Sequence, residues 1–301
     1  MLIEVKKNQV PHLLKNKDLT VQIDLPDEGY GFSRFDWTGK ISKVTFKNIP
    51  VSGRERPDNR DQDVFGRGFY NEFGIDSALG FEEAEMGGWF HKIGIGLLKK
   101  DLPEYLFHKK YTIRPARFES KGDAEKLLLI CTSESMHGYS YVLEKEISIN
   151  DRGFSIEYNL RNTGQKRIRT QEYVHNFMAT DDKLIDPDYV LRFPFEVKPE
   201  GFGETVNPEG LVDIDLRSVR FTGTPNEQFF FSNLSGGEKV QARWELIHRR
   251  TQLGIRETGS FETSKINLWG WRHVISPELF MRVEVDPGES IEWSRNYEVF
   301  S

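Results

Sequence analysis

The chain of 301 residues contains a single cysteine, Cys131, which excludes an internal disulfide. Because Cys131 lies in the apolar stretch LLLICTS, we expect it in the core and not as a nucleophile. No run approaches the roughly 20 apolar residues of a membrane span, and the N-terminal segment lacks the basic and apolar regions of a signal peptide. We therefore expect a cytoplasmic protein.

Long runs of one charge are also missing. The sequence has 41 Lys and Arg against 47 Asp and Glu, a formal net charge of -6. Nucleic acids and anionic membranes call for clustered basic residues, so we expect neither as a partner. A neutral or modestly polar small molecule fits this composition better.

The common catalytic and cofactor motifs are absent. The P-loop, the Rossmann fingerprint, HExxH, paired CxxC and GxSxG do not occur, and the GIG of FHKIGIGLLKK lacks the final glycine of a nucleotide-binding loop. The acidic cluster Asp181, Asp182, Asp186 and Asp188 lacks the spacing and glycine of a calcium loop. We predict a solvated turn there, no metal and no cofactor.

Alternation of apolar and polar residues is the dominant pattern. In FSIEYNLRN, apolar side chains at Phe154, Ile156, Tyr158 and Leu160 occupy every second position, as in a half-buried strand. Similar short runs recur along the chain, whereas helical periodicity is confined to a weak stretch at 81–86. This pattern predicts one all-β domain over 1–301, a large antiparallel sandwich or barrel with very little helix. Residues 50–76, rich in Gly, Arg and Asp, are predicted to form long loops that could carry a site.

One segment indicates a family. In EYNLRNTGQKRIRTQEYVHNFMATDD (157–182), an alternating strand, an NTG turn and a second strand lead to His175 and Asn176. This arrangement resembles the galactose mutarotase (aldose 1-epimerase) family, in which a strand of this kind delivers the catalytic histidine. SPELFMRVEVDPGESIEWSRNYEVF is similar to the family's final strand pair. The resemblance covers roughly 60–301 and implies a β-supersandwich that binds carbohydrate.

The resemblance also implies a chemistry and several site residues. Anomers interconvert when a base takes the proton of the C1 hydroxyl and an acid protonates the ring oxygen. His175 would be the acid, since an unperturbed pKa of about 6.5 suits that role, with Asn176 beside it. FGRGFYNEFGI and GGWFHKIGIG resemble the loops that supply a sugar-binding arginine and a second histidine, here Arg67 and His91. Glu72 either contacts the sugar or pairs with Arg67.

The sequence departs from the family pattern at the residue expected to act as the general base. The comparable late-strand stretch reads KINLWGWRHVISPE, without a glutamate at the expected place. Either His273 or Glu278 is the base, or the protein binds sugar without epimerising it. Trp269 and Trp271, two apart on a strand, share a face and could stack on a pyranose or belong to the core. Arg272 stands in the same stretch.

Other readings stay open. A glycoside hydrolase or lyase of the same fold would need two carboxylates about 5–5.5 Å apart, which Glu72, Glu172 and Glu278 could supply. A phosphosugar would ask for a cationic pocket, to which Arg67, Lys92, Lys99 and Arg272 could contribute. The expected partner is a small carbohydrate, and the expected state is a monomer or homodimer.

Overall fold

Strands provide nearly all of the regular structure. The computed structural model describes residues 11–58 and 63–301; within these ranges it contains 24 strands, every pairing antiparallel, and one short 3-10 helix, η1 (Pro199–Gly201). The stretch 81–86 forms turns. The prediction of an all-β antiparallel fold with very little helix is confirmed. Residues 1–10 and 59–62, parts of the predicted domain and of the predicted loop, lie outside the described residues.

A seven-stranded sheet forms one layer. Its strands are β1 (His12–Lys15), β2 (Leu19–Asp24), β3 (Lys40–Phe46), β4 (Ile49–Pro50), β5 (Phe69–Phe73), β13 (Ile168–Asn176) and β23 (Met281–Val285). Their order is β1-β2-β3-β5-β13-β23, with β4 paired to β3. Strands from both ends of the sequence therefore meet at β13.

A ten-stranded sheet forms the second layer. Its strands are β9 (Arg117–Gly122), β10 (Lys126–Thr132), β11 (Tyr141–Ile149), β12 (Gly153–Asn162), β14 (Tyr189–Arg192), β16 (Val212–Asp215), β17 (Ser218–Phe221), β19 (Val240–His248), β20 (Leu253–Thr263) and β24 (Ser290–Phe300). Their order is β16-β17-β14-β19-β20-β24-β12-β11-β10-β9.

Two small sheets complete the fold. The four-stranded sheet is made of β15 (Thr205–Val206), β18 (Phe229–Phe231), β21 (Ile266–Trp271) and β22 (Val274–Leu279), and the three-stranded sheet of β6 (Trp89–Lys92), β7 (Gly96–Lys99) and β8 (Ile113–Pro115). The first of these lies next to the seven-stranded sheet, because Met178, just after β13, is bridged to Ile275 of β22.

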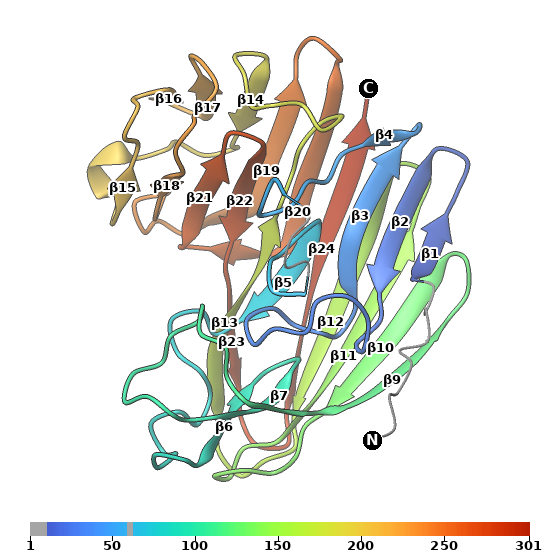
Figure 1. Ribbon diagram of the computed structural model, residues 1–301, viewed down its shortest axis with the longest axis vertical. Helices are drawn as coiled ribbons and strands as arrows, with labels where there is room; N and C mark the ends of the chain where they lie inside the picture. The colour runs from blue at the N-terminus through green and yellow to red at the C-terminus, as the bar shows by residue number, and fades with distance from the viewer. Residues whose placement is uncertain (1–10, 59–62) are drawn as a thin grey trace.

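The two large sheets pack face to face around one apolar core (Figure 1). Phe69 of β5 meets Phe154 of β12 at a ring-centroid distance of 5.3 Å and Tyr297 of β24 at 5.0 Å. Phe73 approaches Trp293 of β24 at 6.2 Å. Interdigitated aromatic rings of this kind give a sandwich much of its burial energy.

The predicted alternation places the side chains of β12 as expected. Phe154, Ile156, Tyr158 and Leu160 are all buried in the core between the sheets. Cys131 on β10 is fully buried too, and burial raises the pKa of its thiol far above the ordinary value. Its core position is confirmed, and a thiol with so high a pKa is a poor nucleophile.

The segment 50–76 departs from its prediction as loop. Its last third contains β5, where all five residues of FYNEF are buried. Alternation disappears where both faces of a strand are covered, so the sequence shows no strand pattern there. The polar members are satisfied inside the protein: Asn71 donates a hydrogen bond to the Tyr173 carbonyl, and Glu72 is ion-paired to Lys92.

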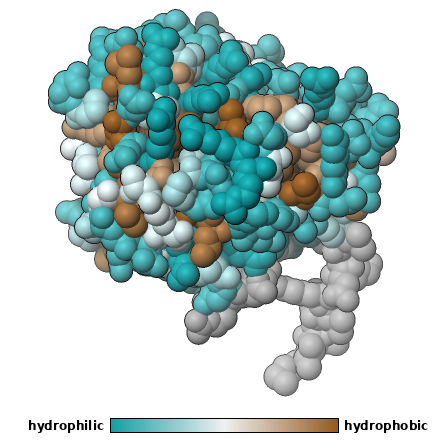
Figure 2. Space-filling model, turned by 90° about the horizontal axis from the view of Figure 1, so that it is seen from above, coloured by the Kyte–Doolittle hydropathy of each residue, from teal (hydrophilic) through white to brown (hydrophobic). Residues whose placement is uncertain are grey.

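The surface has an ordinary composition. On the face seen from above in Figure 2, hydrophobic residues occur in small groups separated by hydrophilic ones. Of the residues that the structure describes, none forms a helix with the length and apolar character needed to cross a membrane.

Candidate functional site

A cavity opens where β13, β21 and β22 meet the loops before β5 and β6. Its volume of about 570 Å³ lies in the range of roughly 300–1,000 Å³ that is common for small-molecule sites. The side chains that matter here are those of Arg34, Tyr173, His175, Trp269 and Glu278.

Strand periodicity explains how three strands aim their side chains at one space. Tyr173 and His175 are two apart on β13, so they share a face. On the antiparallel pair β21–β22, Trp269 lies opposite Ser276, and Asn267 lies opposite Glu278. Two cross-strand pairs on one face thus bring an indole, a hydroxyl, an amide and a carboxyl toward β13.

His175 is held by contacts on both ring nitrogens. Its Nδ1 lies 2.7 Å from the Ser276 hydroxyl, and its Nε2 lies 3.3 Å from Glu278 Oε1. The imidazole stacks on Phe177 with a centroid distance of 3.9 Å and meets the edge of Trp269 at 5.2 Å. These contacts fix the ring plane and point Nε2 at the carboxyl.

Burial controls the protonation of this pair. It raises the pKa of Glu278 to about 8. Burial, with a smaller contribution from the nearby Arg34 guanidinium, lowers the pKa of His175 well below its usual range. Desolvation disfavours the charged form of each group. At neutral pH the proton therefore lies on the Glu278 carboxyl, and the His175 imidazole is neutral.

Arg34 supplies a fixed cation to the cavity wall. Its Nε donates to Glu72 Oε2 at 2.9 Å, and its Nη2 donates to the Tyr173 hydroxyl at 3.1 Å. The guanidinium also lies over the rings of Phe35 and Phe107, 4.5 and 4.7 Å from their centroids. Sequence reasoning missed Arg34, since the segment GFSRFDW carries no motif and the partners of Arg34 come from distant strands.

Comparison with known proteins identifies the architecture. No protein-family model matches the chain, and neither does any curated protein. Among solved structures, a proposed aldose 1-epimerase from Escherichia coli K12 superposes with a TM-score of 0.63 at 9% identity, over 97% of this chain and 99% of that one. A galactose mutarotase related enzyme from Lactobacillus acidophilus superposes with a TM-score of 0.61 at 10% identity, over 97% of this chain and 98% of that one. A galactose mutarotase-like protein from Lactobacillus casei superposes with a TM-score of 0.60 at 12% identity, over 96% of this chain and 100% of that one.

The chain has the galactose mutarotase-like fold. The fold expected from the strand, NTG turn and histidine segment is thereby confirmed. Identities this low concern the fold alone, and function must be argued from the site.

Within the galactose mutarotase-like fold, Glu72 lies beneath the cavity and does not line it. Its buried carboxylate is ion-paired to Arg34 and to Lys92, with Lys92 Nζ 3.0 Å from Oε1, and it accepts a hydrogen bond of 2.6 Å from the Tyr173 hydroxyl. Its cations are therefore these two, and not Arg67 as the sequence suggested. Glu172 is equally buried, bound to Arg295. Neither carboxylate lines the cavity with Glu278, as a hydrolase pair would require.

Arg67 lies in a neighbouring cavity of about 330 Å³, whose lining also includes Lys43 and Arg54. Arg67 Nη2 is 2.5 Å from Asp24 Oδ2, and its Nε donates to the Tyr70 hydroxyl. Arg56 lines both cavities. The structure thus places Arg67 beside the His175 cavity and not in it.

His91 and Asn176 are buried among protein groups. The His91 ring meets Tyr141 at 5.8 Å, and burial lowers its pKa to about 4. Asn176 donates to Glu257 and to the Pro277 carbonyl, and accepts from the Tyr297 hydroxyl. Neither residue lines the cavity, so both contact other protein groups in the interior and not a ligand in the cavity.

The end of β21 and the turn that follows it lie outside the cavity lining. Trp271 donates its indole N–H to the Asn226 carbonyl at 2.7 Å, Arg272 is exposed, and His273 Nε2 lies 3.0 Å from the Arg54 carbonyl oxygen. The structure therefore brings Glu278, and not His273, to His175. Of the other predicted cations, Lys92 is buried against Glu72 and Lys99 is exposed outside the cavity.

Trp269 and Trp271 make a matched pair for testing whether the cavity binds a sugar by stacking, as expected from the sequence. We expect Trp269→Ala to weaken sugar binding about tenfold, because a cavity-wall aromatic contributes on the order of 1 kcal/mol or more to such contacts. Trp271→Ala, on the same strand and face but outside the cavity lining, should bind sugar as the unmodified protein does. Titration with a panel of aldoses, followed by indole fluorescence, measures both. Equal losses in the two variants would contradict a stacking role for Trp269.

Proposed function

We propose that the cavity binds an aldose and that the protein interconverts its anomers by acid–base ring opening. The observation that carries this proposal is the His175–Glu278 pair, whose reacting atoms lie 3.3 Å apart in a cavity of monosaccharide scale. The names of the similar structures from Escherichia coli and Lactobacillus acidophilus point the same way.

The pKa directions favour a specific division of labour. Glu278 holds a proton at neutral pH, so it is the acid that protonates the ring oxygen as the C1–O5 bond breaks. Neutral His175 accepts the proton of the C1 hydroxyl as the carbonyl forms. Rotation about C1–C2 and reclosure with reversed proton transfers give the other anomer. This exchanges the roles that the family resemblance implied, in which His175 was the acid.

The remaining groups serve orientation. Ser276 contacts Nδ1 and so leaves Nε2 as the ring nitrogen that meets the sugar. Trp269 offers an apolar wall beside His175. Arg34 already has Glu72 and Tyr173 as partners, so its charge is positioned before any sugar arrives.

The direct test is anomer exchange followed by NMR saturation transfer. A panel of free aldoses and their 6-phosphates is used, because Arg56 joins the cavity to the basic neighbouring one. We expect faster exchange for at least one sugar at catalytic protein concentration. Ligand line broadening without faster exchange would instead identify a sugar-binding protein, and neither effect with any sugar would reject the proposal.

The exchange rate should depend on pH through Glu278. Because the pKa of this carboxyl is raised to about 8, the acid form is present at neutral pH and is lost as the pH rises through 8. We expect kcat/KM to fall tenfold per pH unit above that value. The free energy of unfolding should also fall as the pH rises from about 4.5 to 8, because the folded protein binds this proton more tightly than the unfolded chain does. Rates measured from pH 6 to 10 check this; a rate that climbs through pH 8 would contradict Glu278 as the acid.

A further inference from the structure

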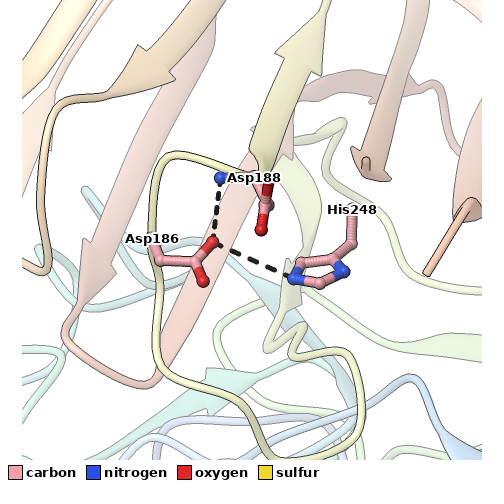
Figure 3. Close-up of side chains that lie close together, drawn as sticks. All are labelled: Asp186, Asp188 and His248. Atoms are coloured by element: carbon pink, nitrogen blue, oxygen red, sulfur yellow. Dashed lines mark hydrogen bonds and ion pairs between the residues drawn. The ribbon is translucent and has the colours of Figure 1, made fainter. Parts of the chain in front are cut away.

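A second cluster of chemically active side chains lies away from the sugar cavity. Asp186 and Asp188 belong to the loop between β13 and β14, and His248 is the last residue of β19, paired across the sheet with Tyr189. Figure 3 shows the two carboxylates and the imidazole turned toward a common space. One ligand atom from each residue lies within 4.8 Å of the others.

The histidine is fixed in position and presents one nitrogen to the carboxylates. His248 is 1% exposed, its ring meets Tyr189 at 4.7 Å, and its Nε2 lies 3.9 Å from Asp186 Oδ1. Within the part of the chain that the structure describes, Nε2 has no hydrogen-bond partner. A buried polar atom without a partner is rare and calls for an explanation such as an ion.

Thr251 anchors the other ring nitrogen of His248. Its hydroxyl oxygen lies 2.9 Å from His248 Nδ1 and 3.3 Å from the His248 carbonyl oxygen, while its own N–H lies 3.3 Å from Nδ1. These contacts hold Nδ1 on the Thr251 side of the ring, so Nε2 is the nitrogen that faces the carboxylates. Such an outer contact on the second nitrogen is usual for metal-binding histidines.

We propose that Asp186, Asp188 and His248 bind a divalent transition-metal ion such as Zn²⁺. One imidazole and two carboxylates suit zinc, with water completing the coordination, whereas calcium prefers oxygen ligands alone. This departs from the solvated, metal-free turn expected from the sequence. The EF-hand spacing is indeed missing, but the imidazole comes from a strand 60 residues further along the chain.

An arginine competes for the same site. Arg250 Nη2 lies 2.6 Å from Asp188 Oδ2, and the Arg250 side chain is 73% exposed, so it can swing into solvent when a cation arrives. Asp186 Oδ1 accepts the backbone N–H of Asp188 at 2.9 Å, which leaves its other oxygen available.

A bound ion would hold the loop that follows the His175 strand. The Ile185 N–H donates to the Arg272 carbonyl, and the Thr180 N–H donates to the Tyr189 hydroxyl. The loop is thereby tied both to the β21–β22 turn and to the strand beside His248. We expect Zn²⁺ to raise the melting temperature, because a ligand that binds only the folded state stabilises it.

The test is calorimetric titration of Zn²⁺ into the full chain after treatment with EDTA. We expect one equivalent to bind, with affinity reduced more than tenfold in Asp186→Asn and in His248→Gln. Asp182→Asn, in the same loop but outside the cluster, and Glu278→Gln, in the sugar cavity, should bind as the unmodified protein does. Circular dichroism of each variant without metal checks folding. If His248→Gln fails to fold, the Zn²⁺ affinity of Asp186→Asn decides whether the cluster binds the ion.

Arg250→Gln provides a test in the opposite direction. Removing the competing guanidinium should tighten Zn²⁺ binding several-fold. The proposal is overturned by the absence of binding, by equal affinities of Asp186→Asn and Asp182→Asn, or by unchanged or weaker binding in Arg250→Gln.

Discussion

His175→Ala and Glu278→Gln should each lower the rate of catalysed anomer exchange by about 10²–10⁴-fold, the usual effect of removing a general acid or base. Both groups lie in the cavity, with Nε2 and Oε1 3.3 Å apart. Neither substitution adds a charge to the interior, so both variants should fold. Saturation-transfer rates and sugar affinities, measured on the same samples, separate loss of chemistry from loss of binding.

The contact between His175 and Glu278 also predicts the exchange rate of the double variant. Because the two residues transfer protons in one step, the double variant should be little slower than either single one. His273→Ala is the matched control, since His273 was the alternative base and its imidazole contacts the Arg54 carbonyl outside the cavity. Unimpaired exchange in His175→Ala would remove that residue from the mechanism, and a large loss in His273→Ala would restore the other candidate.

Arg295→Met should cost about 3–5 kcal/mol of stability, the range found when one partner of a buried ion pair is removed. Arg295 is fully buried between the two large sheets. Its Nη2 lies 2.7 Å from Glu172 Oε2 on β13, and its Nη1 lies 2.5 Å from Glu257 Oε1 on β20. Without the guanidinium, two carboxylates remain in the interior without a countercharge. Urea unfolding at pH 7 measures the loss.

The exposed arginine of the neighbouring strand β23 serves as control. Arg282 is 81% exposed and paired with Glu284, so Arg282→Met should change stability by less than about 1 kcal/mol. The Arg295→Met variant should regain stability as the pH falls from 8 toward 5, because protonation relieves the Glu257 carboxylate, whose pKa burial raises. Equal stability of the two variants, or a loss in Arg295→Met that does not depend on pH, would contradict this role.

Secondary structure was predictable where one face of a strand is exposed to solvent. The strand around Phe154 and Leu160 alternates because only one side meets the core, and its burial follows that pattern. The strand Phe69–Phe73 does not alternate, because both of its faces are covered and its polar residues are paired inside. A pattern that depends on contact with solvent cannot reveal a strand that has none.

Members of the candidate site were predictable only where one strand carries its own signal. His175 could be singled out because its strand, turn and neighbours resemble a known family. The same two-residue spacing points from His175 to Tyr173 and from Trp269 to Asn267, although the sequence does not say which face meets the cavity. Arg34 had no local signal, because its partners lie far from it in the sequence. Asp186 and Asp188 stood out only as part of an acidic cluster, and their proximity to His248 depends on the packing of a distant strand.

The sequence by itself determined the strand content, the near-absence of helix in the described residues and the selection of His175 as a candidate, since these depend on neighbours along the chain. Only the tertiary structure decided that Glu278 meets His175, that Arg67 pairs with Asp24, and that burial moves the pKa values of the Glu278 and His175 side chains in opposite directions. Distance, burial and desolvation depend on which strands pack together, and strands β13 and β22, which bring His175 and Glu278 together, are far apart in the chain.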